Sequence, residues 1–171
     1  MTTATATANT AANTANTANT NSVKASTART TFRLEVAVAI DIDAPRERIW
    51  GLITDASRIP EWNSTITSLS GSIKEGEKIE LKSTLDPSRT FKLKVSDVVA
   101  NEQMKWSDGF APMFRGVRTY RLEDLGGGRT RFSMSEVLSG LMLPMIAGSL
   151  PDFAPSFEAW AADLKREAER G

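Results

Sequence analysis

The stretch "FRLEVAVAIDIDAPRERIW", residues 32–50, contains the pattern that decides the fold. From Phe32 to Ile42, large apolar residues alternate with small or charged ones, which predicts a long strand with one buried face. Pro45 then suits the first position of a helix. The apolar spacing that begins at Ile49 is helical. The chain therefore passes here from a half-buried strand into a short amphipathic helix.

The rest of the chain adds further strands and ends in a helix. A second short helix is expected over residues 59–62. The glycines 126–128 join two predicted strands, so we interpret them as a hairpin turn and not as a phosphate-binding loop, which leads from a strand into a helix. Six further segments alternate with period two and predict an antiparallel meander: 66–73, 78–85, 91–99, 103–108, 114–123 and 130–138.

The last segment restores the helical period, with Phe153, Phe157, Trp160 and Leu164 on one stripe. We therefore predict an α+β fold. A curved seven-stranded antiparallel sheet is wrapped around one long C-terminal helix, with two short helices after the first strand.

Composition excludes several kinds of function. Lys and Arg balance Asp and Glu at 21 each, so no net charge attracts nucleic acid. The chain has no cysteine and no histidine, which removes disulfides, thiolate nucleophiles, Ser-His-Asp triads and the common zinc sites. We expect no metal and no cofactor, and any acid or base must be Asp, Glu, Lys, Tyr or water.

The N-terminal segment differs from the rest. Residues 2–22 contain only Thr, Ala, Asn and one Ser, with no large apolar group to offset the entropy of ordering, so we predict a disordered tail over 1–30 and one domain over 31–171. The tail lacks the features of a secretory signal, so we expect a cytoplasmic protein. The Asn-Ser-Thr of residues 63–65 matches a glycosylation acceptor, and without an export signal we interpret that match as chance.

Three short motifs carry a resemblance to a known family. Residues 42–45 (Ile-Asp-Ala-Pro), 49–50 (Ile-Trp) and 60–63 (Pro-Glu-Trp-Asn) resemble the opening of the START-related SRPBCC superfamily, and in particular its bacterial polyketide cyclase/dehydrase-like members. The similarity covers residues 32–170 and implies the helix-grip fold. It also implies a cavity between sheet and helix that holds a hydrophobic or amphipathic molecule. The superfamily shares no catalytic set, so no catalytic residue is carried over.

The stretch "WSDGFAPMFRGVRTY", residues 106–120, places charged residues in step with large apolar ones. A hairpin register with Leu122 opposite Phe132 keeps both apolar sets on one face. That register pairs Tyr120 with Met134 and Arg118 with Glu136, and the preceding strand has Trp106 and Asp108 in its inward phase. Either the three charged residues form a structural network near the sheet end, or Arg118 anchors a ligand's carboxylate, phosphate or enolate.

The same two interpretations, packing or ligand contact, apply to the aromatic stripe of the last helix. The candidate ligand-binding residues are Arg118, Glu136, Asp108, Trp106, Tyr120, Met134, Phe153, Phe157 and Trp160. The apolar run 138–150 is too short to cross a bilayer. It is either buried packing or a Met-bearing lid over the cavity, and we favour the lid.

Three functions remain open. The first is a carrier or sensor that binds a hydrophobic or aromatic small molecule. The second is a cyclase or dehydratase that works without histidine, in which Arg118 stabilises an enolate and Asp108, Glu136 or Tyr120 moves protons. The third is a protein-interaction domain like the superfamily's co-chaperones, which predicts a small, filled cavity. No nucleic-acid partner and no integral membrane segment are expected, and the oligomeric state is left open.

Overall fold

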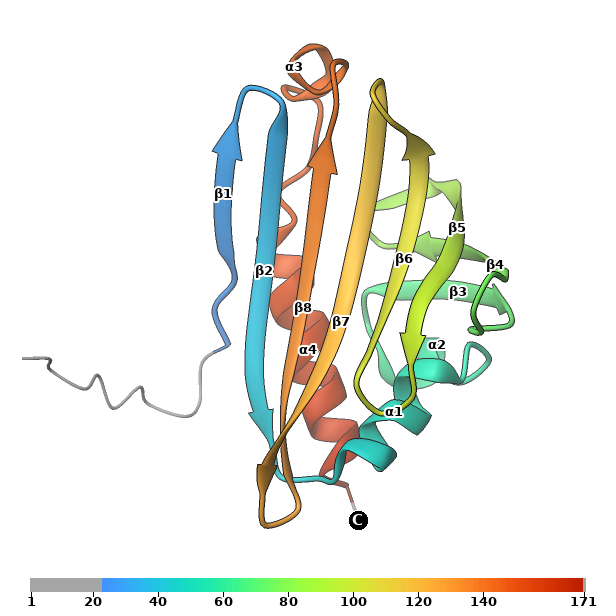
Figure 1. Ribbon diagram of the computed structural model, residues 1–171, viewed down its shortest axis with the longest axis vertical. Coiled ribbons are helices and arrows are strands. Elements are labelled where there is room, and N and C mark those ends of the chain that lie inside the picture. The colour runs from blue at the N-terminus through green and yellow to red at the C-terminus, as the bar shows by residue number, and fades with distance from the viewer. Residues whose placement is uncertain (1–22, 171) are drawn as a thin grey trace, which may run out of the picture.

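The computed structural model describes residues 23–170 and has an α+β architecture in which one curved antiparallel sheet covers a long C-terminal helix (Figure 1). The strand order in the sheet is β1-β2-β8-β7-β6-β5-β4-β3. In chain order the elements are β1 (Ser26–Thr30), β2 (Arg33–Ile42), α1 (Arg46–Thr54), α2 (Ile59–Trp62), β3 (Ile66–Gly71), β4 (Lys78–Ser83), β5 (Asp86–Val99), β6 (Gln103–Phe110), β7 (Phe114–Gly126), β8 (Arg129–Ser139), α3 (Leu143–Ile146) and α4 (Ala154–Ala168).

The sheet has eight strands, and the prediction of seven was wrong. The additional strand, β1, pairs antiparallel with β2 from Ser26↔Ala37 to Thr30↔Arg33. These residues fall in the predicted tail of residues 1–30, because the sequence of β1 carries no apolar alternation; in the structure every side chain of β1 is exposed. Backbone hydrogen bonding to an edge strand needs no such pattern. The predicted tail residues 1–22 lie outside the described residues.

The short helices are also placed differently from the prediction. α1 and α2 follow the second strand of the sheet and not the first, and α3 is a further short helix between β8 and α4. The six later strands and the C-terminal helix lie where the sequence predicts them, and β7 and β8 join through the predicted turn at Gly126. β5 begins at Asp86 and not at Phe91, because Ser83 pairs with Asp86 and the hairpin turn is formed by the two residues between them.

The core lies between the concave inner face of the sheet and α4. Trp160 of α4 is at its centre, stacked on Phe132 at a ring distance of 5.3 Å and edge-on to Trp62 at 5.6 Å. Tyr120 packs between Trp160 and Trp106, at 5.4 Å and 4.9 Å. All five rings are buried, so this aromatic cluster contributes much of the apolar area removed from water on folding.

Polar contacts attach α4 to the loop after α2. The buried Asp163 carboxylate accepts hydrogen bonds from the Ser64 amide (2.7 Å) and hydroxyl (2.6 Å). The Asn63 side chain is buried, its oxygen accepts from the Thr65 amide (3.1 Å) and hydroxyl (2.7 Å), and its nitrogen donates to the Trp160 carbonyl. The Asn-Ser-Thr motif therefore has a structural role in this loop.

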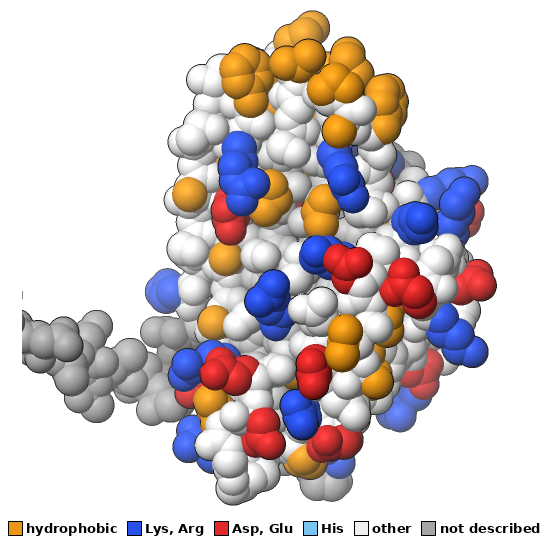
Figure 2. Space-filling view, in the orientation of Figure 1, with side chains coloured by type: hydrophobic (Ala, Val, Ile, Leu, Met, Phe, Trp, Pro, Cys, Tyr) orange, Lys and Arg blue, Asp and Glu red, His pale blue; other side chains and the backbone are white. Residues whose placement is uncertain are grey.

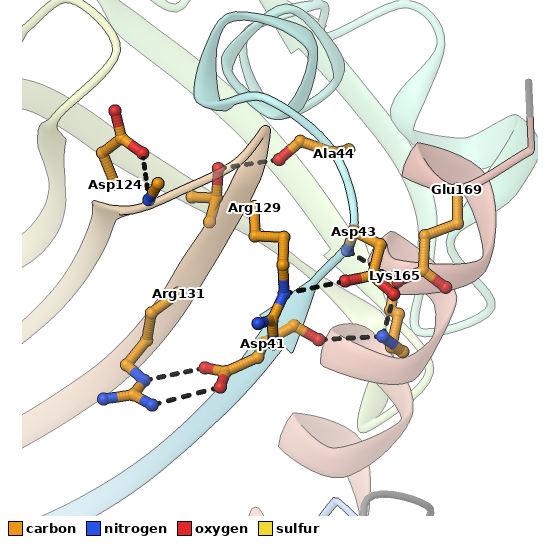
Figure 3. A network of polar contacts seen from close by, with 10 residues as sticks. Asp41, Asp43, Ala44, Asp124, Arg129, Arg131, Lys165 and Glu169 are labelled. Carbon is orange, nitrogen blue, oxygen red and sulfur yellow. Dashed lines mark hydrogen bonds and ion pairs between the residues drawn. The ribbon is translucent and has the colours of Figure 1, made fainter.

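At the end of the sheet where β2 leads into α1, a charged network binds α4 to the strands (Figure 3). The Lys165 ammonium donates to the Asp41 carbonyl at 2.8 Å, and the Glu169 carboxylate accepts from the Asp43 amide at 2.8 Å. The Arg131 guanidinium forms two hydrogen bonds to the Asp41 carboxylate, at 2.8 and 3.1 Å. These contacts fix the C-terminal end of α4, and the cavity described below lies toward the other end of the helix.

Candidate ligand-binding cavity

A cavity of about 400 Å³ opens between the inner face of the sheet and the segment that runs from α3 into α4. Its volume is within the range of pockets that hold small molecules. The side of β3, β4 and β5 contributes Thr65, Ile66, Leu81, Ser83, Leu85, Asp86, Arg89, Phe91 and Leu93; β6, β7 and β8 contribute Trp106, Asp108, Phe114, Gly116, Arg118, Glu136 and Leu138; and the helical side contributes Ile146, Ser149, Leu150, Pro151, Phe153 and Ser156.

The strand register arranges the inner face in rows, and these rows explain where the cavity begins. The row Met104–Tyr120–Met134–Val38 is buried in the aromatic core. The next row toward the α3 end is Trp106–Arg118–Glu136–Val36, and the one after it is Asp108–Gly116–Leu138–Leu34. Trp106, Arg118 and Glu136 line the cavity, so the Arg118 row is the boundary between the packed core and the hollow part.

An ion pair stands on this boundary. The Arg118 guanidinium donates through Nε (2.9 Å) and Nη2 to the same Oε2 atom of Glu136, and both side chains are only 19% exposed. The Phe157 ring lies 5.1 Å from the guanidinium carbon, a cation–π contact from the α4 side. Burial disfavours the charged guanidinium, but the Glu136 carboxylate outweighs this effect, so the pKa of Arg118 is raised and it stays charged.

Asp108 is the second carboxylate of the cavity. Burial raises the pKa of the Asp108 carboxyl above its ordinary value, and the neighbouring Glu136 carboxylate raises that pKa further, while Arg89 on the opposite wall partly offsets the effect. The cross-strand partner of Asp108 is Gly116, and a Cβ atom there would lie 2.6 Å from Asp108 Oδ1. The absence of a side chain at Gly116 therefore makes the space that the Asp108 carboxylate occupies.

The predicted register is confirmed, because Leu122 pairs with Phe132, Tyr120 with Met134 and Arg118 with Glu136. Of the nine candidate residues, five line the cavity: Arg118, Glu136, Asp108, Trp106 and Phe153. The other four, Tyr120, Met134, Phe157 and Trp160, are buried in the core. Tyr120 and Met134 lie one row deeper than Arg118, because strand phase identifies the face on which a side chain lies but not how deep its row is. Phe157 and Trp160 lie on α4 and pack against Arg118 and Tyr120 from the helix side.

Sequence reasoning missed the opposite wall of the cavity and Gly116. Arg89 and Phe91 of β5 lie together there, with the guanidinium carbon of Arg89 4.5 Å from the Phe91 ring centre. The sequence predicts strands over 78–85 and 91–99, so Asp86 and Arg89 fall between them, whereas the structure has both in β5. Gly116 had a usable signal, since a single glycine inside a strand pattern often marks a close approach of other atoms.

The apolar run 138–150 provides buried packing, one of the two roles considered for it, and it also lines the cavity. Leu138 and Leu143 are buried against Leu34, and Ile146 and Leu150 line the cavity on its helical side. A lid movement of this segment stays a prediction. Among residues 23–170, no group of three or more acidic side chains could hold a metal ion.

Comparisons with known proteins extend this description. The model of the family described as "Polyketide cyclase / dehydrase and lipid transport" matches residues 33–170. No curated protein matches the chain. A conserved protein of unknown function from Enterococcus faecalis has a similar structure, with a TM-score of 0.62 and 14% identity over 86% of this chain and 78% of the other.

Two further structures are similar. A START superfamily protein from Mycobacterium smegmatis has a TM-score of 0.59 and 18% identity over 80% of this chain and 97% of its own. A protein in the dynemicin biosynthetic locus has a TM-score of 0.61 and 18% identity over 80% of this chain. The chain spans 48% of that protein's length. At these identities the structural similarity shows a shared fold.

Proposed function

The chain belongs to the polyketide cyclase/dehydrase and lipid transport family, and on this premise we propose that it is a carrier or sensor that binds a hydrophobic or aromatic small molecule in the cavity between the sheet and α4. The apolar wall formed by Leu81, Phe91 and Leu138 would hold the ligand body. The polar end of the ligand would lie at the Arg118 row.

The observation that carries this proposal is the incomplete use of Arg118. The two side-chain hydrogen bonds of Arg118 with good geometry among residues 23–170 both go to one oxygen of Glu136, and the Tyr120 hydroxyl is a further polar neighbour of the guanidinium. A guanidinium has five N–H donors, and Arg118 lines the cavity with donors that Glu136 does not use. A carboxylate, phosphate or enolate oxygen of a ligand would accept from the unused donors of Arg118 while Glu136 keeps the guanidinium in place.

The test uses anilinonaphthalene sulfonate, an aromatic probe with one anionic end, and follows quenching of tryptophan emission, because Trp106 lines the cavity. We expect Arg118→Gln combined with Glu136→Gln, which removes the pair without leaving one buried charge unpaired, to weaken probe binding by about tenfold or more, as loss of a charged hydrogen bond implies. Arg121→Gln is the matched control, since Arg121 is an exposed arginine on the same strand, on the other face of the sheet.

Equal affinity in the double variant and the wild type would contradict the anchoring role of Arg118. Native mass spectrometry of gently purified protein, followed by organic extraction, then identifies the natural ligand. A protein without bound or bindable small molecules would favour the interaction-domain alternative, which the 400 Å³ cavity does not support.

The cyclase or dehydratase alternative rests on a different observation, the Asp108 carboxyl. Its raised pKa and its place in the cavity beside Glu136 suit a group that accepts and returns a proton. If the protein is an enzyme, Asp108→Asn abolishes turnover of a poly-β-carbonyl substrate while probe binding is retained. If it is a carrier, the same variant changes affinity only, and no turnover is found in the wild type. A cytoplasmic location stays a prediction.

A further inference from the structure

Six exposed apolar side chains gather at the end of the molecule where β2 begins and β8 ends (Figure 2). Met145 is 81% exposed, Phe110 is 68% exposed and Leu141 is 57% exposed. These side chains come from the β1–β2 turn, the β6–β7 turn and the segment from β8 to α3, and together they form what we call the apolar tip: Phe32, Phe110, Met113, Leu141, Met142 and Met145.

Backbone hydrogen bonds hold the three segments of the tip together. The Gly140 amide donates to the Phe32 carbonyl at 3.1 Å, the Leu141 amide to the Pro112 carbonyl at 3.0 Å, and the Met142 amide to the Met113 carbonyl at 2.9 Å. Gly140 has a φ of +132°, and a Cβ atom there would lie 2.3 Å from the Met113 carbonyl oxygen. The exposed side chains are therefore presented by a connected framework and not by independent loops.

The three segments of the tip carry basic but no acidic residues, and next to them Glu35 of β2 forms an ion pair with Arg33 at 2.7 Å. Residues 30–33, 109–115 and 139–150, which form the three segments, contain no Asp or Glu, although the whole chain has 21 of them. Their only charged residues are Arg33 and Arg115, which both pair with Ser139 in the sheet and so lie in one row on either side of β8. Figure 2 shows Lys or Arg side chains directly below the apolar end of this face.

We propose that the apolar tip docks this protein onto a membrane surface that contains anionic phospholipids. Exposed apolar residues next to basic ones are the combination that inserts into the headgroup region, where apolar side chains leave water and arginines meet lipid phosphates. Docking at a surface is distinct from crossing the membrane, and within residues 23–170 no helix is long and apolar enough to cross one.

The shape of the tip favours a lipid surface over a second copy of the chain. The tip is a narrow end made of turns, at one end of the longest axis of the molecule (Figure 1), whereas stable protein interfaces bury a broad, complementary area. A fluid bilayer requires no complementary shape. Two copies placed tip to tip would also bring the Arg33 and Arg115 rows of both copies toward one another.

Docking would also place the cavity near the lipid. Phe114, Ile146 and Leu150 lie in the segments of the tip and line the cavity. This part of the inference rests on the proposed function, and it implies that the ligand is a membrane-resident amphiphile which enters from the bilayer. The docking itself is measured without any ligand, so the two proposals can fail separately.

The experiment is flotation of the full chain with phosphatidylcholine vesicles that contain or lack phosphatidylglycerol. The wild type is expected to float with the anionic vesicles, and less at high salt. The triple variant Phe110→Ser, Leu141→Ser and Met145→Ser is expected to lose about tenfold or more of this binding. Arg33→Gln with Arg115→Gln is expected to remove the preference for phosphatidylglycerol.

Val99→Ser is the matched control, because Val99 is an exposed apolar residue beside the β5–β6 turn, at the opposite end of the molecule (Figure 1). Met145→Glu is a second test that changes one highly exposed side chain, and it is also expected to reduce flotation. The proposal is overturned if the wild type floats with neither vesicle or if the tip variants float as well as the wild type. It is also overturned if sedimentation shows a dimer that the triple variant loses, which would assign the tip to a second copy.

Discussion

The contact between Gly116 and Asp108 predicts that Gly116→Ala changes stability in opposite directions, depending on whether residue 108 is Asp or Ala. Gly116 has no positive φ, so alanine fits its backbone. Replacing glycine by alanine at such a position stabilises the fold by about 0.4–1 kcal/mol, because it reduces the entropy of the unfolded chain. The new Cβ atom would, however, lie 2.6 Å from Asp108 Oδ1, closer than these atoms approach in folded proteins.

Relief of this overlap requires the Asp108 carboxylate to move, and overpacking of this kind costs about 1–3 kcal/mol. We therefore expect Gly116→Ala to destabilise the wild type by up to about 2 kcal/mol. In an Asp108→Ala background the obstructing oxygen is absent, and the same substitution is expected to stabilise the protein by about 0.4–1 kcal/mol. The contact with Leu138 Cδ2, at 3.3 Å, is present in both backgrounds and cancels in the difference between them; the full gain in the Asp108→Ala background requires Leu138 to shift by a few tenths of an ångström.

The assay is urea unfolding of the wild type, both single variants and the double variant, followed by tryptophan fluorescence. The double-mutant cycle removes the backbone contribution and leaves the overlap, so the coupling free energy is expected to be about 1–3 kcal/mol. A coupling below about 0.5 kcal/mol, which is the error of additivity for independent sites, would refute the reasoning that Gly116 makes space for Asp108.

Three further predictions concern titration. The folded-state pKa of Asp108 is raised, so its contribution to stability falls as pH rises from 3.8 through that raised pKa. Asp108→Asn should therefore have a higher melting temperature than the wild type at neutral pH. This difference should shrink to zero below pH 3.8. Asp41 shows the opposite sign, since its hydrogen bonds with Arg131 lower its pKa. Asp41→Asn should therefore lower the melting temperature at neutral pH, and this difference from the wild type should disappear as pH falls from 3.8 through the lowered pKa. If the two variants change the melting temperature in the same direction at neutral pH, one of the two assignments is wrong. Burial raises the pKa of Tyr120 to about 12, although Arg118 partly opposes this effect. The chain has one tyrosine, so tyrosinate absorbance during a pH titration reports this residue alone. A titration midpoint near 10.0, while tryptophan fluorescence still shows a folded protein, would contradict the burial of Tyr120.

The sequence predicts the fold well because its signals are local. Alternation from Phe32 to Ile42 and the stripe from Phe153 to Leu164 each report one buried face, and the family resemblance drawn from the motifs around Pro45 and Trp62 is confirmed by the family match. β1 could not be predicted in this way, because an exposed edge strand is held by backbone hydrogen bonds and its side chains carry no pattern.

The sequence predicts on which face of the sheet the candidate residues lie, but not whether they line the cavity or lie in the packed core. Alternation correctly placed Arg118 and Glu136 on the inner face and opposite one another. It placed Tyr120 and Met134 on the same face, yet these two are core residues, because the distance between α4 and the sheet varies along the helix. That distance is set by large side chains far apart in sequence, Trp160 above all, and no local pattern reports it.

The position of the Arg118 row has a consequence for how this protein could change. Below the row, the inner face is locked by interdigitated rings around Trp160, where substitutions cost the most. Above the row, Leu81, Phe91 and Leu138 line the cavity on one side and pack against their neighbours on the other. Residues in the hollow half can therefore be exchanged for larger or smaller ones without repacking the other half. One architecture of this kind can be adapted to ligands of different shape by changing its lining alone, by engineering or in evolution.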